Sequence, residues 1–415
     1  MILYAQAIDI LRIAGCERKK QIAIETIPLG EVEGRICAAD VVSSDELPAF
    51  ANSAMDGFAV RSKETLRAGV FLRAVNLVAA GDGKQVVETE PNVCIEIMTG
   101  ARVPEGFDAI VRVEDTESRI EPSGERMVRL SKAIDAGENL RSAGEDYGHG
   151  ESVIRVGERV TAAHVMACAA LGISRLQVLR KIRIGVVSTG RELVSHETVP
   201  VDAQIRNATL PYLLVRLEAL GVDVVQLGTI PDQPDEYQAI ITQPRIRDFD
   251  VIISTGAVSV GKFDFVSNVL ERIGASIHFH KVAIRPGKPV LFAELAQNGP
   301  AFFGVPGNPV STSVGLRFFI EPFLRALQGL PPEQTVKLRL RNDFKKPEGL
   351  RCFFKARLAP SGNDVTELEI LKGQASFMIK PLTRATMWAI LAEEGQSVRA
   401  RDLVEAVPVD MSFGE

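Results

Sequence analysis

The sequence has no long hydrophobic run. Its apolar stretches are far shorter than the roughly 18 residues that span a bilayer, so no transmembrane helix is predicted. The N-terminal segment MILYAQAIDILRIAG has no basic n-region and carries Asp9 within its apolar pattern. This pattern predicts an amphipathic helix rather than a signal peptide.

Cysteine and histidine are scarce, with five residues of each among 415. The cysteines lie far apart and form no CxxC pair, so neither a zinc site nor a disulfide framework is expected. Such cysteine usage fits a reducing cytoplasm. His278 and His280 alternate along SIHFHKVAI, where a half-exposed strand is a better explanation than a metal site.

Positive charge is not in excess. The chain has 48 Lys and Arg against 53 Asp and Glu, a net charge of −5, which argues against a general nucleic-acid-binding protein. A local basic pocket remains possible within this balance. The hydrophobic fraction of 46% and the charged fraction of 24% are those of a globular protein. The length predicts roughly two to four domains.

The pattern of apolar residues changes along the chain. Residues 1–40 are helical and then extended, and short apolar runs between turns from Pro48 to Ile154 predict a β-rich domain. The segment TAAHVMACAALG predicts a helix. From Lys181 strands alternate with helices, which predicts a parallel sheet covered on both faces. Short strands return after Leu330 and predict a small all-β domain.

Three glycine-containing loops follow predicted strands of the α/β segment: STGRE (188–192), STGAVSVGKFD (254–264) and VPGNPVS (305–311). Such loops lie at the carboxyl edge of a parallel sheet, where ligands bind. STGAVSVG, with Gly256, Ser259 and Gly261, reads as a phosphate cradle before a helix that begins around Phe265. One loop alone would favour an ordinary turn, whereas two loops and a nearby basic segment favour a phosphate site.

That basic segment is KVAIRPGKP, which brings Lys281, Arg285 and Lys288 together around a Pro-Gly turn. Three cations there could hold a phosphate or another oxyanion. Without the neighbouring glycine loops, a solvated surface turn would explain the segment equally well.

Three acids, Glu192, Asp232 and Asp264, lie just past predicted strand ends and could converge. Carboxylates facing a phosphate pocket make sense chiefly if a divalent cation lies between them, and Mg²⁺ is the usual choice. Helix N-capping is the competing interpretation for Asp232 and Asp264.

Three unusual strings mark the N-terminal half: PAFANSAMDGFAV (48–60), IMTGARVPEGFDAIVRVEDTE (97–117) and RSAGEDYG (141–148). On physical grounds alone, Met55-Asp56-Gly57 and Gly144-Glu145-Asp146 are turns. Their spacing demonstrates no chemistry.

These strings nevertheless carry a resemblance. With STGREL, TGAVSVGKFDF, KVAIRPGKP and FGVPGNPVS, the strings NSAMDGFAV, MTGARVPEGFDAIV and AGED occur in one order over essentially the whole chain. The chain thereby resembles the MoeA-type molybdopterin molybdenumtransferases, a family that also includes the gephyrin E domain. Any one string alone would be weak, whereas the set is very specific.

The resemblance implies a multidomain α/β plus β fold. The expected parts are a helical and linker domain (1–42 with 150–180), a β-rich domain (43–149), an α/β molybdopterin-binding domain with a parallel sheet (181–329) and a C-terminal β-barrel-like domain (330–415). The resemblance also implies a cytoplasmic homodimer. In it, the MDG, MTG and GED motifs of one subunit face the α/β pocket of the other.

The implied reaction is the last step of molybdenum cofactor synthesis. Adenylylated molybdopterin and molybdate are the substrates, the metal enters the dithiolene, and AMP leaves. By motif, Asp56, Thr99 and Asp146 match the partner-side catalytic residues, and Glu192, Asp232 and Asp264 match acids for Mg²⁺ and nucleotide. The implied cofactor-binding residues are Gly256, Ser259, Gly261, Lys281, Arg285, Lys288, Pro306, Gly307, Asn308 and Ser311. The implied molybdate residues are Lys288, Pro289, Ser311, Lys355 and Ser376.

Several positions depart from the pattern of the family. Ala257 replaces a glycine, Arg191 replaces an Asp or Asn, Lys262 replaces an acidic or small residue, and Asn207 replaces an acid in RNAT; Arg285 replaces a lysine and Lys355 an arginine. The pocket is therefore less acidic than usual. These departures motivate an alternative, a catalytically altered paralogue that binds molybdopterin or a partner protein without inserting metal. Another enzyme on the same α/β fold and a scaffold role are further alternatives.

Overall fold

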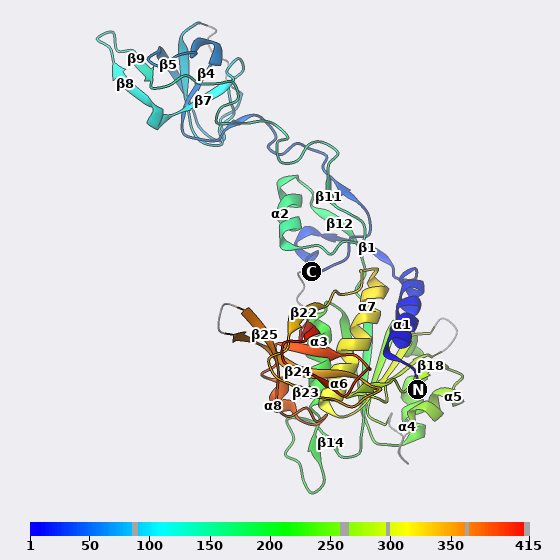
Figure 1. The fold of residues 1–415 in the computed structure, drawn as a ribbon. Coiled ribbons are helices and arrows are strands. Elements are labelled where there is room, and N and C mark those ends of the chain that lie inside the picture. Colours follow the sequence, from blue (N-terminus) through cyan, green and yellow to red (C-terminus); the bar gives the residue numbers. More distant parts are fainter. Residues whose placement is uncertain (85–89, 258–264, 296–298, 362–364, 411–415) are drawn as a thin grey trace.

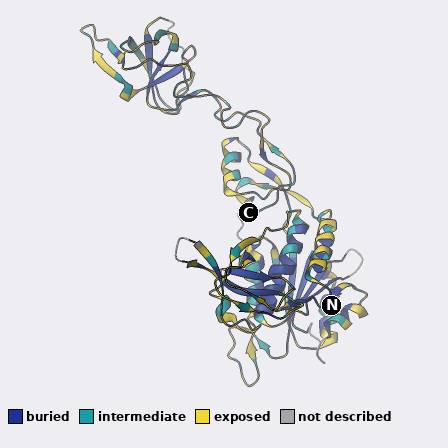
Figure 2. Ribbon diagram, viewed as in Figure 1, coloured by how far each residue is buried: buried dark blue, intermediate teal, exposed yellow. Residues whose placement is uncertain are grey.

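The computed structural model describes residues 1–415 except 85–89, 258–264, 296–298, 362–364 and 411–415. The molecule is elongated, with a β-rich region at one end joined through a narrow segment containing α2 to a larger body (Figure 1). Buried residues concentrate in the strands of that body and in the centre of the β-rich region (Figure 2). Within the described residues, no helix is long and apolar enough to cross a membrane.

The helices are α1 Tyr4–Lys19, α2 Ala162–Ala170, α3 Thr209–Ala219, α4 Pro234–Ile241, α5 Val266–Arg272, α6 Pro309–Gly315, α7 Glu321–Gln328 and α8 Ile379–Leu382. A π-helical turn, Leu316–Ile320, joins α6 to α7. Short 3-10 turns span Leu29–Glu31, Ser62–Glu64, Val113–Asp115 and Pro244–Asp248.

The α/β sheet has the strand order β16-β13-β17-β21-β20-β18: Asp223–Ile230, Arg183–Thr189, Val251–Thr255, Ala301–Val305, Leu291–Glu294 and Ser276–His280. The first four strands are parallel, as predicted, whereas β20 and β18 extend the sheet in antiparallel fashion. Short connections without a crossover helix allow this antiparallel edge. Alternate residues of each strand feed two separate cores, one beneath α3, α6 and α7 and one beneath α4 and α5.

The first helix packs on the α/β body. Ala7 and Leu11 of α1 are fully buried in its core, and Gly15 lets α1 approach α7, because a Cβ there would lie 2.7 Å from Ala326 Cβ. The predicted domain that combines residues 1–42 with 150–180 therefore does not hold for α1, because the apolar face of α1 packs against α7.

Residues 24–42 do pack with 150–180. Strand β1 (Ile24–Pro28) pairs with β12 (Arg175–Leu179), and β2 (Val41–Val42) pairs with β11 (Ser152–Ile154). Helix α2 covers them, and its N-terminus is capped by Thr161 Oγ1, which accepts a hydrogen bond from the backbone N–H of His164.

The β-rich region forms a six-stranded sheet of order β7-β4-β6-β5-β9-β8: Ala109–Arg112, Gly57–Val60, Val93–Ile97, Phe71–Val78, Arg126–Leu130 and Thr116–Ile120. Two small cores fill it, and all their residues come from residues 58–134. The pair β3 (Asn52–Ser53) and β10 (Leu140–Arg141) forms part of its connection to the body.

The C-terminal region contains a sheet of order β19-β24-β26-β28-β22, with β25 also on β24: Ile284–Arg285, Arg351–Ser361, Met387–Leu391, Leu403–Pro408, Val336–Arg339 and Val365–Ile370. The remaining short strands are β14 Leu193–Val194, β15 Ile205–Arg206, β23 Phe344–Lys345 and β27 Ser397–Val398. Because β19 belongs to the basic segment, this segment joins the C-terminal sheet to the α/β body.

Candidate active site

A cavity of about 560 Å³ opens at the carboxyl ends of β13, β17 and β21. This is the edge at which the glycine loops were predicted to lie. Its walls are Thr189, Gly190, Glu192, Leu193, Ile205, Arg206, Asn207, Ala208, Thr209, Asp232, Thr255, Gly256, Ala257, Gly307, Asn308, Pro309 and Phe377. Parts of all three predicted loops therefore meet in one cavity.

Close backbone packing forms its floor. Gly256 has φ +94, and a Cβ there would lie 2.5 Å from the carbonyl oxygen of Thr189, so only glycine fits. Gly307 lies against Gly256, where a Cβ would be 3.6 Å from the Cα of Gly256. Ala257 also adopts a positive φ, +49, which is strained for a residue with a side chain. Ser259, Gly261 and Lys262 lie outside the described residues.

Two of the three predicted acids, Glu192 and Asp232, meet at one wall. Burial is the main cause that raises the pKa of Asp232, and the neighbouring Glu192 carboxylate raises it further. Two neighbouring carboxylates repel each other, and a divalent cation bound to both would remove this repulsion. The pair can therefore serve as cation ligands. Asp264 lies outside the described residues, and within those no group of three or more His, Cys, Asp or Glu is arranged to hold a metal ion.

Hydroxyl and amide groups line another part of the cavity wall. The Oδ1 of Asn207 accepts hydrogen bonds from Leu210 N and Thr209 Oγ1, both at 3.1 Å, and so caps α3. Its Nδ2 is buried without a partner in the described structure. The hydroxyls of Thr209 and Thr255 lie 3.4 Å apart. The departure at Asn207 thus puts a neutral amide at this wall.

The basic segment does not line this cavity, as far as the described residues show. Arg285 and Lys288 are exposed, and Lys281 is half-buried. The segment instead lies beside the first turn of α6, because a Cβ on Gly287 would lie 3.5 Å from the carbonyl oxygen of Ser311. Lys288 therefore directly follows a residue, Gly287, that packs against the backbone of Ser311.

The other molybdate candidates gather around the same turn. The backbone N–H of Val310 donates to the carbonyl of Ser376 at 3.0 Å, and Pro289 directly follows Lys288. Lys355 is fully buried, and its Nζ donates to the carbonyls of Ala375 and Met378 at 3.4 and 3.1 Å. Lys355 therefore lies behind the 374–378 loop, and its ammonium group is bonded to that loop.

The MDG and MTG motifs meet in the β-rich region. Asp56 Oδ1 accepts hydrogen bonds from Thr99 N at 2.7 Å and from Thr99 Oγ1 at 2.8 Å. These two hydrogen bonds lower the pKa of the exposed Asp56 carboxyl. The pair therefore presents a fixed, charged carboxylate to the surface.

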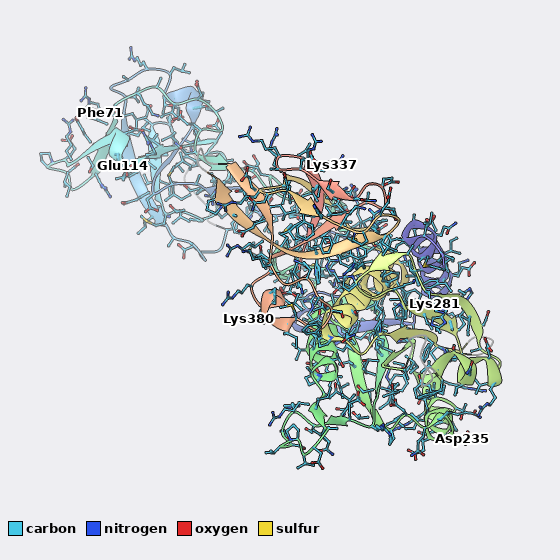
Figure 3. All side chains as sticks on the ribbon, turned by 60° about the horizontal axis from the view of Figure 1, so that its bottom comes forward. Phe71, Glu114, Asp235, Lys281, Lys337 and Lys380 are labelled. Atoms are coloured by element: carbon cyan, nitrogen blue, oxygen red, sulfur yellow. The ribbon has the colours of Figure 1, made fainter. Side chains whose placement is uncertain are left out.

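Asp146, from the GED motif, is exposed, and its backbone N–H donates to Leu47 O at 2.9 Å in the connection towards the body. Within one chain these motifs do not line the cavity. Figure 3 shows the separation: Phe71 and Glu114 lie on the β-rich region, well away from Lys281 and Asp235 on the α/β body. A site built from both parts would need a second subunit.

Known proteins match this arrangement along the whole chain. Residues 3–172 match the family described as MoeA N-terminal region (domain I and II), and residues 185–326 match a probable molybdopterin binding domain. The molybdopterin molybdenumtransferase of Synechococcus elongatus is 39% identical over 94% of this chain and 96% of that protein. The chain belongs to the molybdopterin molybdenumtransferase family.

Other relatives agree with this assignment. The molybdopterin molybdenumtransferase of Haemophilus influenzae is 31% identical over 94% of this chain and 95% of that protein. The crystal structure of the molybdopterin biosynthesis MoeA protein from Pyrococcus horikosii superposes with a TM-score of 0.78 at 25% identity, covering 99% of this chain and 100% of that one. The predicted multidomain fold is confirmed, and the matches give no support to the altered paralogue.

Several residues of the cavity were not singled out from the sequence: Thr189, Arg206, Thr209, Thr255 and Phe377. Thr189 and Thr255 end strands whose glycine loops were recognised, so strand-end hydroxyls were an available signal. No sequence signal separates Phe377 from a core phenylalanine. Only its 67% exposure beside the cavity distinguishes it.

Proposed function

We propose that this chain inserts molybdenum from molybdate into adenylylated molybdopterin and releases AMP, in the last step of molybdenum cofactor synthesis. The observation that carries the proposal is the cavity, which combines glycine backbone, hydroxyl groups and a carboxylate pair. Such a cavity suits a phosphorylated ligand at the carboxyl edge of an α/β sheet. The curated relatives bear the name of this activity.

The carboxylate pair fits Mg²⁺. Glu192 and Asp232 would hold the cation, and its charge would offset that of the pyrophosphate oxygens of the substrate. Asp264 remains the third proposed ligand. The cation would also remove the mutual repulsion that contributes to the raised pKa of Asp232.

Other residues of the chain would bind the phosphates and the molybdate. The glycine backbone at Gly256 and Gly307 would let the substrate phosphates approach closely, together with Pro306, Asn308 and the predicted Ser259 and Gly261. Lys281, Arg285 and Lys288 would supply positive charge to pterin phosphate or molybdate. Pro289, Ser311 and Ser376 would complete the oxyanion site at the first turn of α6.

We propose a homodimer whose active sites each use two subunits. The proposal rests on the position of the Asp56–Thr99 pair and Asp146, which lie on other parts of the fold than the cavity. A fixed carboxylate that no cation pairs with in the described part of its own chain could then act on a substrate bound by the other subunit.

Mixing Asp56→Ala chains with Asp232→Ala chains should restore activity to about a quarter of the wild-type level. Half of the dimers would then be mixed, and each of those would contain one intact site. Activity is measured after subunit exchange has been verified by mass spectrometry. As a control, Asp232→Ala mixed with Glu192→Ala should recover nothing, because both changes lie in one cavity. A mixture of the first pair that exchanges but stays inactive would contradict shared sites.

Lys288→Ala should weaken the use of molybdate by roughly ten- to a hundredfold, since each charge-assisted hydrogen bond contributes about 1.5–3 kcal/mol. The fold should survive, because Lys288 is exposed. Saturation curves for molybdate test this, with Lys337→Ala, an exposed lysine on β22, as the control. Loss of pterin binding with an unchanged molybdate curve would assign Lys288 to the phosphate site instead.

The reaction itself is tested by reconstitution. Purified protein with adenylylated molybdopterin, Mg²⁺ and molybdate should release AMP and activate an apo-molybdoenzyme. Repeating the assay with tungstate establishes which oxyanion is used. Release of no AMP by a folded wild-type dimer would contradict the proposed function.

A further inference from the structure

Phe377 stands out among the walls of the cavity because it is a large aromatic side chain that is 67% exposed. Single exposed apolar residues are common on protein surfaces and usually need no explanation. This ring differs because it is the one aromatic side chain among the described walls of a cavity that also presents glycine backbone, hydroxyls and carboxylates.

The loop that carries the ring is fastened on both sides of it. The Nζ of Lys355 donates to the carbonyls of Ala375 and Met378, and Val310 N donates to the carbonyl of Ser376. The backbone carbonyl immediately before the ring, that of Ser376, is therefore bonded to α6, and the one immediately after it, that of Met378, is bonded to β24. A loop backbone held in this way lowers the entropic cost of ordering the loop when a ligand binds beside Phe377.

A second set of hydrogen bonds fixes the start of the loop. The side chain of Gln374 accepts from Lys355 N at 3.0 Å and donates to the carbonyls of Lys355 and Leu371 at 2.8 and 2.7 Å. Burying the ammonium of Lys355 with no carboxylate partner in the described structure is costly. Burial also lowers the pKa of this lysine to about 8. The buried ammonium of Lys355 thus holds the loop in place at an energetic cost. The aromatic ring at the apex of this loop, Phe377, is nevertheless exposed and is not packed in the core.

We propose that Phe377 is a stacking platform for a planar heterocycle of the substrate. This inference rests on the proposed function, whose substrate carries two such rings, an adenine and a pterin. A rigid aromatic ring beside hydrogen-bonding groups is the usual recognition surface for a flat, polar heterocycle. Phe377 would fix the orientation of the ring, while the glycine floor and the carboxylate pair hold the phosphates.

Phe377→Leu keeps an apolar side chain but removes the aromatic face. Isothermal calorimetry with AMP and, separately, with 6-hydroxymethylpterin should show affinity for one of them reduced by about five- to a hundredfold. The probe that loses affinity identifies the ring that stacks on Phe377. Phe377→Tyr and Phe377→Trp should bind that probe nearly as well as the wild type. Ribose 5-phosphate, which lacks a planar heterocycle, should bind the wild type and Phe377→Leu equally.

Ile379→Ala is the matched control, since Ile379 is a 41% exposed apolar residue two positions further on that does not line the cavity. It should leave both affinities unchanged, and the thermal midpoint of every variant should match the wild type.

Three results would overturn the inference: equal binding of both ring probes by wild type and Phe377→Leu, an equal loss for ribose 5-phosphate, or a change of oligomeric state as the only effect. A wild-type dimer that binds neither ring probe and inserts no metal would contradict the proposed function, and this inference with it. Metal insertion by the wild type with no effect of Phe377→Leu on binding contradicts the platform alone.

Discussion

Replacing Gly57 with alanine is expected to lower the free energy of unfolding of the β-rich region by at least about 3 kcal/mol. Gly57 begins β4, and a Cβ there would lie 1.9 Å from the carbonyl oxygen of Val111 and 3.1 Å from the Cα of Arg112. Both atoms belong to the backbone of β7, so no side-chain rotation can remove the overlap. The edge strand β7 would have to separate from β4.

The loss of stability caused by Gly57→Ala should be confined to the β-rich region. The two cores of the β-rich region are built from residues 58–134 alone, so this region can melt while the body stays folded. Calorimetry should show an early transition in Gly57→Ala that hydrogen exchange assigns to residues 57–130. Gly83→Ala is the control in the same region, because a Cβ there meets no atom within 4 Å. A single transition at the wild-type temperature would contradict the expected clash.

This clash also bears on the candidate site. Gly57 immediately follows Asp56, whose carboxylate is held by Thr99. From the sequence, Met55-Asp56-Gly57 could be interpreted only as a turn. The glycine is required instead by contact with a strand some fifty residues away in the chain, which local pattern does not reveal.

The α/β region was the most predictable part because its signals are local. Buried strands that end in glycine, each followed by an amphipathic helix, were enough to indicate the cavity edge at Thr189, Thr255 and Val305. The antiparallel edge formed by β20 and β18 was not predicted, since an apolar strand has the same pattern in either direction. The packing of α1 on α7 was missed for a related reason: an amphipathic face does not identify its partner.

Side-chain direction was least predictable. Lys281, Arg285 and Lys288 are close in sequence to one another, yet the cavity is lined by the glycine loops and by Phe377 from the C-terminal region. A residue such as Phe377 joins the site only through the contact between the 374–378 loop and α6, a tertiary contact between segments about sixty-six residues apart. Resemblance to the family supplied the adjacent Ser376, but it could not supply the ring.

The stability of the protein should rise with pH between about 8 and 10.5 because of Lys355. Its burial lowers the pKa from 10.5 in the unfolded chain to about 8 in the fold. Below pH 8 both states hold the proton, and the buried ammonium destabilises the fold in full. Between these two values the unfolded chain binds more protons than the folded one, so raising the pH favours folding.

The size of this effect follows from the shift. Each pKa unit corresponds to 1.36 kcal/mol, so Lys355 should contribute about 3 kcal/mol of added stability over the whole window. Buried tyrosines and cysteines also titrate at high pH, and their contribution has to be removed. The difference in the free energy of unfolding between wild type and Lys355→Met removes their contribution, because both proteins contain those tyrosines and cysteines.

Urea unfolding of wild type and Lys355→Met at a series of pH values spanning this window is the measurement. The advantage of the wild type over the variant should grow as the pH rises, whatever its value at the start of the series, where loss of the bonds to Ala375 and Met378 offsets relief of the buried charge. Lys337→Met, which removes an exposed lysine from β22, controls for the loss of one charge.

A difference between wild type and Lys355→Met that stays constant across the range would mean that Lys355 keeps its proton in the fold. The ammonium would then be stabilised by more than two carbonyl groups, and an anion at the first turn of α6 would be its natural partner.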